Sequence, residues 1–323
     1  MKVHGEETMQ SKICLNKKLI FLPLLYLILF LSNLYAIENK IVLKINNEIV
    51  TSLDIKNEIQ YLKSLNPSIK NLSQEKINLI GKNSLIREKI KENEILKYVE
   101  NIQIEKKILD KLINNRYSKL DFSTKNQFLE YLKINQVDIN IIEKKISIEA
   151  VWNQLIYSKF SSKVKIDENN LKKKIKGLND KKKKSYLLSE IFFKISDKKI
   201  LNTKYDEIKN IILENGFESA ALTYSISDSS EIGGKLEWIE ENSLNKTIKE
   251  NLSKLEKDSF TRPIFTQNGY LILKIRDIKF TQIQYDEESQ LKKLIDYETN
   301  QQLNQYSNNY FNKIKKDIII NEF

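Results

Sequence analysis

Histidine and cysteine are almost absent from this chain of 323 residues. Each occurs once, as His4 and Cys14. From residue 15 onward, this absence excludes structural disulfides, zinc sites built from Cys and His, Ser-His-Asp triads and cysteine nucleophiles. Any chemistry in that part of the chain must therefore use carboxylates, Lys, Tyr, Ser, Thr or backbone groups.

Glycine and proline are also scarce, with 7 and 3 residues. No Gly-rich phosphate loop is present, so we expect no ATP and no other cofactor. The net charge is +11, but Lys alternates with Glu along most segments, and an AT-rich genome produces the same lysine excess. Without an Arg-rich groove or an aromatic RNA-binding signature, we expect no nucleic-acid partner. We also expect no metal.

The N-terminal region has the pattern of an export signal. Lys17 and Lys18 precede the apolar run Leu19 to Leu31, and Leu34-Tyr35-Ala36 is typical of a signal-peptidase site. The apolar run is short against the ~20 residues that span a bilayer. We expect residues 1–36 to be removed before Ile37. The alternative is an uncleaved membrane anchor that extends through Ala36.

Short strands and long helices are predicted next. Ile41 to Ile45 and Glu48 to Thr51 alternate like a hairpin around Asn46-Asn47, since Asn tolerates the positive φ of such turns. Thr51 is a candidate helix cap with Asp54 in the first turn. The pattern is then helical to about Gly177. Two apolar stripes in this region predict helix packing: Ile104, Ile108 and Leu112, and Ile141, Ile148, Trp152 and Leu155.

A lysine-rich stretch around Gly177 predicts a domain boundary, with a basic binding patch as the alternative. Beyond it the elements fit a compact α+β unit of about a hundred residues. The expected elements are a strand at 186–195, helices at 205–215 and 217–224, a turn at Gly233-Gly234, and a strand at 269–280. Paired carboxylates along the helices are interpreted as solvated faces, because none stands in an apolar setting.

The tail returns to a helix and ends in a strand. Leu303, Tyr306, Tyr310 and Ile314 form one stripe, and Asp317 to Phe323 reads as an edge strand. An edge strand needs a partner, and the hairpin at 41–51 is an apolar candidate. If they pair, both ends of the chain form one domain into which the α+β unit is inserted.

This order of segments resembles SurA and the parvulin-type peptidyl-prolyl isomerases. The resemblance is carried by KINNEIVTSLDIKNEI (44–59), SEIFFKI (189–195), GGKLEWI (233–239) and RPIFTQNGYLILKI (262–275). It implies an α+β fold: a mainly helical chaperone core, completed by the C-terminal helix and strand, with one inserted parvulin-like domain. The expected boundaries are 1–36 for the signal peptide, 37–180 for the helical domain, 181–280 for the parvulin-like domain and 281–323 for the closing segment.

The resemblance also implies a depleted catalytic site. The family's two histidine positions fall at Glu190 and Leu271, and its acidic or cysteine position falls near Ser227, with Asp228 adjacent. An apolar substrate groove would remain. Its candidate residues are Leu244, Ile248, Leu252, Phe265 and Tyr270. The alternative is that these five residues form only the core of the domain.

Three functions follow from these features. The first is an ATP-independent periplasmic chaperone that binds unfolded or extended exported polypeptides, expected to be outer-membrane protein precursors, with weak or no isomerase activity. The second is an active parvulin-type isomerase, against which Glu190 and Leu271 argue. The third is an interaction protein tethered to the membrane through Leu19 to Ala36.

Overall fold

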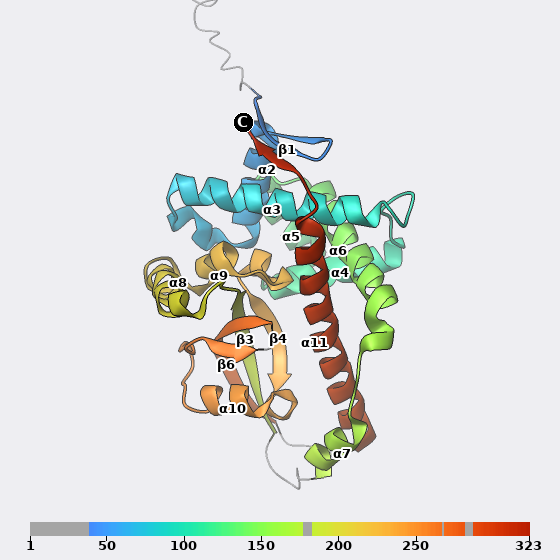
Figure 1. Cartoon of the computed structure of the whole chain (residues 1–323), viewed down its shortest axis with the longest axis vertical. Coiled ribbons are helices and arrows are strands. Elements are labelled where there is room, and N and C mark those ends of the chain that lie inside the picture. The colour runs from blue at the N-terminus through green and yellow to red at the C-terminus, as the bar shows by residue number, and fades with distance from the viewer. Residues whose placement is uncertain (1–38, 177–182, 267, 282–286) are drawn as a thin grey trace, which may run out of the picture. The chain divides into compact units, whose positions relative to one another are not determined.

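The computed structural model describes residues 39–176, 183–266, 268–281 and 287–323. The predicted signal peptide and most of the predicted boundary around Gly177 lie outside these residues. Ile41–Phe323 form one compact unit (Figure 1). It contains long helices and two small antiparallel sheets, which confirms the predicted α+β class. None of the helices in the described ranges is long and apolar enough to cross a membrane.

The two ends of this unit meet in a three-stranded sheet. Its strands are β1 (Ile41–Ile45), β2 (Glu48–Thr51) and β7 (Ile320–Glu322), in the order β2-β1-β7. The predicted pairing of the terminal strand with the hairpin is therefore confirmed. In the turn, Asn46 has a φ of 52° but Asn47 does not have a positive φ, so only half of the turn prediction is right. The Asn46 backbone N–H donates to the Ile319 carbonyl at 2.9 Å, which ties the turn to the last strand.

Helices make up most of the rest. Thr51 caps the first helix, because its hydroxyl accepts from the Asp54 N–H while the Asp54 carboxylate accepts from the Thr51 N–H at 2.8 Å. The helices are α2 (Ser52–Leu65), α3 (Gln74–Ile95), α4 (Lys106–Lys119), α5 (Lys125–Ile134), α6 (Ile139–Phe160), α7 (Glu168–Lys176) and α11 (Glu287–Lys315).

The two predicted helical stripes have different outcomes. Ile148 and Trp152 of α6 are buried, as expected. On α4 the stripe is wrong in register, because Ile104 precedes the helix, Ile108 is exposed, and the buried residue is Ile113.

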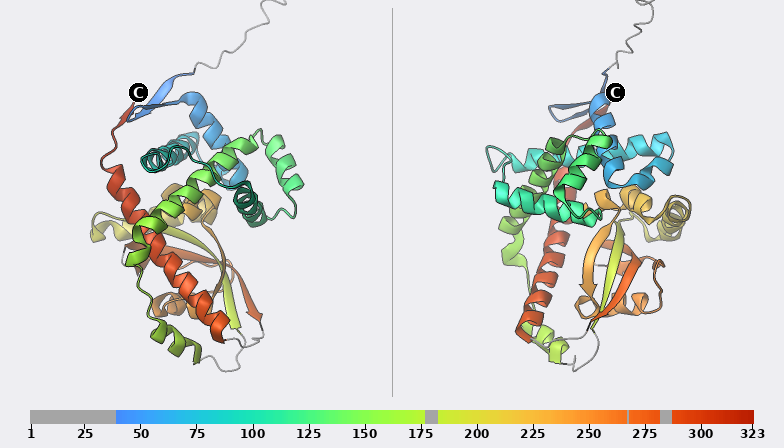
Figure 2. Two further views of the ribbon diagram at one scale, coloured as in Figure 1. Left: turned by 90° about the vertical axis from the view of Figure 1, so that its right-hand side faces the viewer. Right: turned by 180° about the vertical axis from the view of Figure 1, so that it is seen from behind.

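The long helix α11 closes the helical region and runs from α7 to the three-stranded sheet (Figures 1 and 2). Its predicted stripe packs on α6: Leu303, Tyr310 and Ile314 join the cluster around Trp152. The indole N–H of Trp152 donates to the Ser307 hydroxyl at 2.8 Å. These contacts anchor the returning chain to the N-terminal helices.

Between α7 and α11 the chain builds a four-stranded sheet in the order β4-β3-β6-β5. Its elements are β3 (Lys183–Phe193), α8 (Leu201–Asn215), α9 (Phe217–Tyr224), β4 (Lys235–Glu240), α10 (Lys246–Leu252), β5 (Ile264–Thr266) and β6 (Gly269–Thr281). Both glycines of the predicted turn have positive φ, 72° at Gly233 and 74° at Gly234. A β-carbon on Gly234 would stand 2.1 Å from the Glu190 carbonyl oxygen, so this close approach requires glycine.

The sheet has an apolar cluster on each face, because successive side chains of a strand point to opposite sides. Ile191 and Phe193 of β3 pack with α8 and α9 in the larger core. Tyr186 and Leu188 pack with Leu252 of α10 in a separate cluster. A side chain is therefore assigned to the α8/α9 face or the α10 face by its place in the strand.

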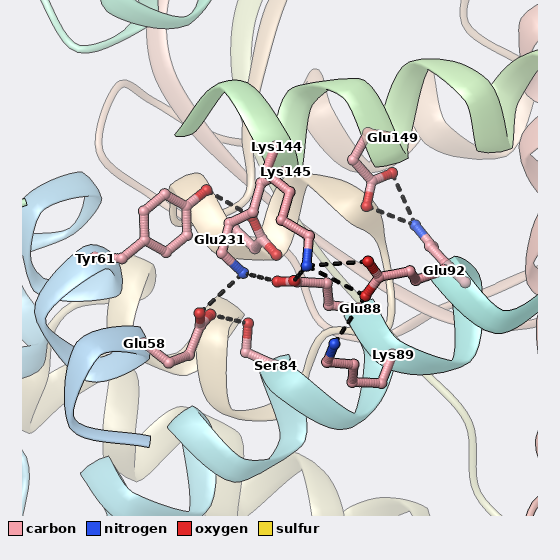
Figure 3. Close-up of polar contacts among 11 residues, drawn as sticks. Glu58, Tyr61, Ser84, Glu88, Lys89, Glu92, Lys144, Lys145, Glu149 and Glu231 are labelled. Carbon is pink, nitrogen blue, oxygen red and sulfur yellow. Dashed lines mark hydrogen bonds and ion pairs between the residues drawn. The ribbon is translucent and has the colours of Figure 1, made fainter. Parts of the chain in front are cut away.

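A buried ionic network joins α2, α3 and α6 (Figure 3). The Lys145 ammonium of α6 lies 2.9 Å from the Glu58 carboxylate of α2 and also pairs with Glu88 of α3. Glu58 and Lys145 are both almost completely buried. Burial lowers the pKa of Lys145, but Glu58 and Glu88 outweigh it, and the pKa lies well above its ordinary value. Lys145 therefore stays charged inside the helical core.

The same network reaches the four-stranded-sheet region through the short helix η4 (Asp228–Ile232). The Lys91 ammonium of α3 is 2% exposed and lies 2.8 Å from Glu149 of α6 and 3.0 Å from Asp228 of η4. The Tyr61 hydroxyl of α2 donates to Glu231 of η4 at 3.1 Å (Figure 3). The buried ammonium of Lys91 thus connects α3 to both α6 and η4, which are far apart in sequence.

Both partners stabilise the charge of Lys91. Burial lowers its pKa, but Asp228 and Glu149 together hold the pKa above its ordinary value. Asp228 has a side chain that is 44% exposed. Partial burial acts to raise its pKa, and the charges of Lys91 and Arg87 overcome this and hold the pKa below its ordinary value. The pair is therefore ionised at neutral pH.

Replacing this cation is expected to destabilise the protein strongly. Lys91→Met leaves Glu149 and Asp228 without their counter-ion. Because these two side chains are 29% and 44% exposed, the expected cost is that of lost hydrogen bonds between charged groups, about 1.5–3 kcal/mol. The matched control is Lys125→Met, which removes a pair with Asp110 whose side chains are 45% and 48% exposed. That change is expected to cost at most about 1 kcal/mol. Urea unfolding measures both free energies, and equal losses would contradict a structural role for Lys91.

Candidate functional site

Glu190 lies on the face of the sheet that α10 covers. It follows Leu188 by two residues along β3 and pairs in register with Leu273 of β6, and both leucines belong to the α10 cluster. Leu271 packs against the same cluster and pairs with Phe192. The structure therefore brings the two predicted catalytic positions, Glu190 and Leu271, to one face, but only one of them is polar.

A chain of serine hydroxyls ends at the Glu190 carboxylate. The Ser229 hydroxyl donates to Glu190 Oε1 at 2.9 Å. Ser229 is in turn 2.8 Å from the Ser227 hydroxyl, which lies 2.9 Å from that of Ser225. Ser225 also accepts from the Phe192 backbone N–H at 3.0 Å. The polar groups around Glu190 thus satisfy one another inside the domain.

Burial raises the pKa of Glu190, and the hydrogen bonds from Ser229 and Ser227 oppose this shift only in part. Tyr297 of α11 lies near Glu190. Burial raises the pKa of Tyr297 to about 12, and the negative charge of Glu190 adds to this shift. A carboxyl group in this setting can accept hydrogen bonds and can hold a proton. It has no second titratable group at Leu271 with which to exchange that proton.

The predicted groove of five residues is wrong as a single surface. Leu244, Ile248 and Leu252 pack with the α10 cluster. Tyr270 instead belongs to the core on the α8/α9 face, where its ring lies 5.8 Å from Phe193 and 5.6 Å from Phe265. Strand alternation is the reason, since Tyr270 and Leu271 are neighbours in β6 and must point to opposite faces.

The alternative prediction is that the five groove candidates form only the core of the domain. It fits those candidates whose side chains are buried. Leu244 is 4% exposed and Leu252 is 0% exposed. Phe265 does not fit it, because its side chain is 65% exposed, with the Lys198 ammonium 5.6 Å from its ring.

Ser227 and Asp228, predicted as one degenerate position, point to different partners. Ser227 belongs to the hydroxyl chain that leads to Glu190. Asp228 pairs with Lys91 of the helical core. The carboxylate nearest to the family's acidic position thus joins the helices and η4, and it is not part of the polar group around Glu190.

Sequence reasoning missed the buried charges of the helical core. It interpreted paired carboxylates as solvated, whereas Glu58 is 3% exposed and Lys145 is 6% exposed. A signal was present. Glu58 stands three residues after Ile55 and four before Leu62, so it falls within the apolar stripe of α2. Lys145 stands four residues after Ile141 and three before Ile148, so it falls within the apolar stripe of α6 in the same way. A charged residue inside an apolar stripe predicts a buried partner.

Sequence reasoning also missed a cleft of about 780 Å³ in the helical region. This volume lies within the ~300–1,000 Å³ typical of ligand sites. The residues that line the cleft come from β1, α2, η1 (Pro67–Asn71), α3 and the segment at the end of α5. They are Val42, Ser52, Ile55, Lys56, Ile59, Gln60, Lys63, Lys70, Gln74, Asn78, Lys82, Ile134, Asn135 and Gln136. We refer to it as the lysine cleft.

The raised pKa of Glu190 predicts a pH-dependent stability. The folded protein holds the Glu190 proton to higher pH than the unfolded chain, so this group lowers stability as the pH rises through the interval above the ordinary value of 4.5. Glu190→Gln is expected to increase the free energy of unfolding at neutral pH and to lose most of that advantage below pH 4.5.

The control is Glu130→Gln, at an exposed position of α5. Urea unfolding followed by circular dichroism at several pH values measures the difference. A gain for Glu190→Gln that does not change with pH would contradict a penalty from the buried charge.

Comparison with known proteins identifies the sheet domain. Residues 189–277 match the rotamase family described as the PPIC-type PPIase domain. This range begins at Ser189 in β3 and ends at Asp277 in β6, so it contains every residue of the Glu190 site except Tyr297. No curated protein matches the chain.

Several solved structures also match. The peptidyl-prolyl isomerase PrsA of Bacillus anthracis is 22% identical over 74% of this chain and 100% of its own, with a TM-score of 0.31. A Campylobacter jejuni chain, from work that describes PEB4 and Cj1289 as SurA-like chaperones, is 20% identical over 88% and 99%, with a TM-score of 0.34. The parvulin domain of PpiD from E. coli is 22% identical over 31% and 93%, with a TM-score of 0.26.

At these TM-scores the structural matches do not decide a function, whereas the family match assigns the domain directly. The resemblance predicted from the sequence is confirmed there: residues 189–277 of this chain form a PPIC-type, parvulin-like domain.

Proposed function

We propose that this protein is an ATP-independent chaperone that binds unfolded, extended polypeptides and has weak or no isomerase activity. The observation that carries the proposal is the lysine cleft, which lies in the helical region outside the parvulin domain. It offers both apolar and polar groups on a concave surface, as binding to an unfolded chain requires.

The rim of the cleft supports this role. Ile134, at the end of α5, is 80% exposed, while Ile55 and Ile59 of α2 are mostly buried beneath the surface. An exposed aliphatic side chain beside a shaped hollow favours contact with apolar residues of another chain. Weak contacts of this kind exchange readily, so client release needs no ATP.

The sheet edges offer a second means of contact. In the three-stranded sheet, β2 and β7 are both outer strands. Outer strands present unpaired backbone groups to which an extended chain can add. Export to the periplasm and outer-membrane clients belong to the same proposal, and they are supported by the pattern of Lys17 to Ala36 and by the resemblance to SurA.

The holdase function predicts suppressed aggregation. A denatured outer-membrane β-barrel protein is diluted into buffer with a stoichiometric amount of this protein, and light scattering is recorded. Scattering is expected to fall. Ile134→Ser is expected to weaken the effect, because it removes the exposed apolar group at the cleft. Leu213→Ser, a similar change at a 67% exposed position of α8, serves as the control. Unchanged scattering with the unaltered protein would contradict the proposal.

A parvulin-type isomerase is the second candidate, and the family match at residues 189–277 favours it. Rotation about an X-Pro bond has a barrier of ~20 kcal/mol. A site can lower this barrier if it holds the proline ring in an apolar pocket while the amide twists. At Glu190 such a pocket would place a buried carboxyl group against the substrate, which is unfavourable unless the group is protonated.

We therefore expect the protein to accelerate isomerisation weakly or not at all. Exchange-detected NMR on a short proline peptide measures the rate with and without the protein. The double variant Glu190→His/Leu271→His restores the family residues and is expected to gain activity if the face near α10 admits a peptide. Catalysis by the unaltered protein at the level of an ordinary parvulin would overturn the expectation and favour the isomerase.

A further inference from the structure

The lysine cleft carries charge of one sign. Its lining includes Lys56, Lys63, Lys70 and Lys82 and no carboxylate. Lys82 is compensated, because it pairs with Glu322 of β7. Among the residues that the structure describes, Lys56, Lys63 and Lys70 form no ion pair. The cleft therefore presents three uncompensated cations around one hollow.

The lysines of the neighbouring ionic network behave differently. Lys89 pairs with Glu48. Lys89 also pairs with Glu92, and Lys144 pairs with Glu88 and Glu92 (Figure 3). A lysine that is paired with a carboxylate contributes little electrostatic potential at a distance. Unpaired charges of one sign around a concave surface instead produce a strong electrostatic potential inside it. The lysine cleft is thus suited to negative groups.

The remaining lining suits a polypeptide backbone. Five side-chain amides line the cleft, and an amide carries both donors and acceptors. They are Gln60, Gln74, Asn78, Asn135 and Gln136. Some of this capacity is used internally, since Gln60 Nε2 donates to the Asn135 carbonyl at 2.8 Å and Gln74 Nε2 donates to Asn78 at 2.9 Å. Gln60 Nε2 also donates to Gln136 Oε1 at 3.3 Å. The second N–H of Gln74 and the side-chain oxygens of Gln60 and Gln74 can therefore serve a bound chain.

The floor of the cleft is aliphatic and close-packed. A β-carbon on Gly81 of α3 would stand 2.7 Å from Ile59 Cγ1 of α2, so the glycine lets the two helices approach closely beneath the cleft. Aliphatic groups at the floor favour the apolar side chains of a bound segment. No aromatic residue lines the cleft, so stacking of nucleic-acid bases has no support there.

From these features, and resting on the proposed function, we infer that the lysine cleft selects acidic segments of extended polypeptides. Carboxylates of the segment meet Lys56, Lys63 and Lys70, its backbone meets the amides, and its aliphatic side chains meet Ile55, Ile59 and Ile134. Unfolded chains rich in Asp and Glu are then bound in preference to neutral or basic ones.

Fluorescence anisotropy with labelled synthetic peptides tests the selection. The probe is a peptide of alternating Glu and Val, and its partner has Gln in place of every Glu. The cleft variant is the triple change Lys56→Gln/Lys63→Gln/Lys70→Gln. The control is Lys199→Gln/Lys209→Gln/Lys254→Gln, which removes three exposed lysines of the parvulin domain. Both variants lose the same charge, so a general attraction affects them equally.

The unaltered protein and the control are expected to bind the Glu peptide alike and more tightly than the Gln peptide. The cleft variant is expected to lose roughly tenfold in affinity for the Glu peptide, as befits three partly exposed ion contacts. The preference is expected to weaken as salt is added.

Three results would overturn the inference. The first is equal loss in both triple variants, which would indicate attraction by net charge alone. The second is equal affinity for the two peptides, which would indicate a neutral client. The third is displacement of the Glu peptide by a thymidine oligonucleotide at lower concentration than by unlabelled Glu peptide, which would indicate a nucleic-acid site.

The scattering assay separates this inference from the proposed function. If the unaltered protein and both triple variants suppress aggregation equally and no peptide is preferred, the selection is wrong and the chaperone stands. If the unaltered protein neither suppresses aggregation nor binds either peptide, both are wrong.

Discussion

The buried ammonium group of Lys91 is the interaction on which the arrangement of this protein depends. A charge removed from water is tolerated only when its partners are fixed around it. Here the partners are Glu149 of α6 and Asp228 of η4, so the requirement of one side chain on α3 determines where two other elements lie. Because η4 leads through Gly233 and Gly234 into β4 and carries Ser229, the polar surroundings of Glu190 depend on the same junction.

The two polar regions of the molecule differ in what they leave available. Around Glu190, serine hydroxyls and a carboxyl group satisfy one another within the domain, and Leu271 offers no polar group. In the lysine cleft, three ammonium groups and part of the amide capacity remain for another molecule. In the parvulin-like domain, the polar groups near Glu190 bond to one another. In the helical region, the polar groups of the lysine cleft remain available to bind a ligand. This contrast is the physical basis for the proposal that clients bind in the helical region.

Local features of the fold could be predicted from the sequence because they depend on neighbouring residues. The capping box at Thr51, the helix at 217–224 and the paired glycines at 233 and 234 all follow from short-range stereochemistry. The terminal strand and its partner also followed, since an apolar edge strand needs pairing. The α4 stripe failed because a period of four residues drifts around a helix of 3.6 residues per turn, so it could not specify which residue is buried.

The candidate site was harder to predict because it depends on contacts between distant segments. Tyr270 is predicted from the sequence to share one groove with Leu244 and Leu252, although the folded strand places Tyr270 on the opposite face of the sheet. Lys91 lies 58 residues from Glu149 and 137 from Asp228, and no periodicity relates such positions. The lysine cleft draws on β1, α2, η1, α3 and the end of α5, so its lysines become a group only after the chain has folded.

Site-specific photo-crosslinking to an unfolded outer-membrane protein tests most directly whether clients bind in the helical region. A photoreactive residue is placed at Ile134, on the rim of the lysine cleft, or at Ile248 of α10, on the face that carries Glu190. The account predicts crosslinks from position 134 that unlabelled client competes away, and few from position 248. Crosslinks confined to position 248 would show that clients meet the parvulin face and would contradict the account.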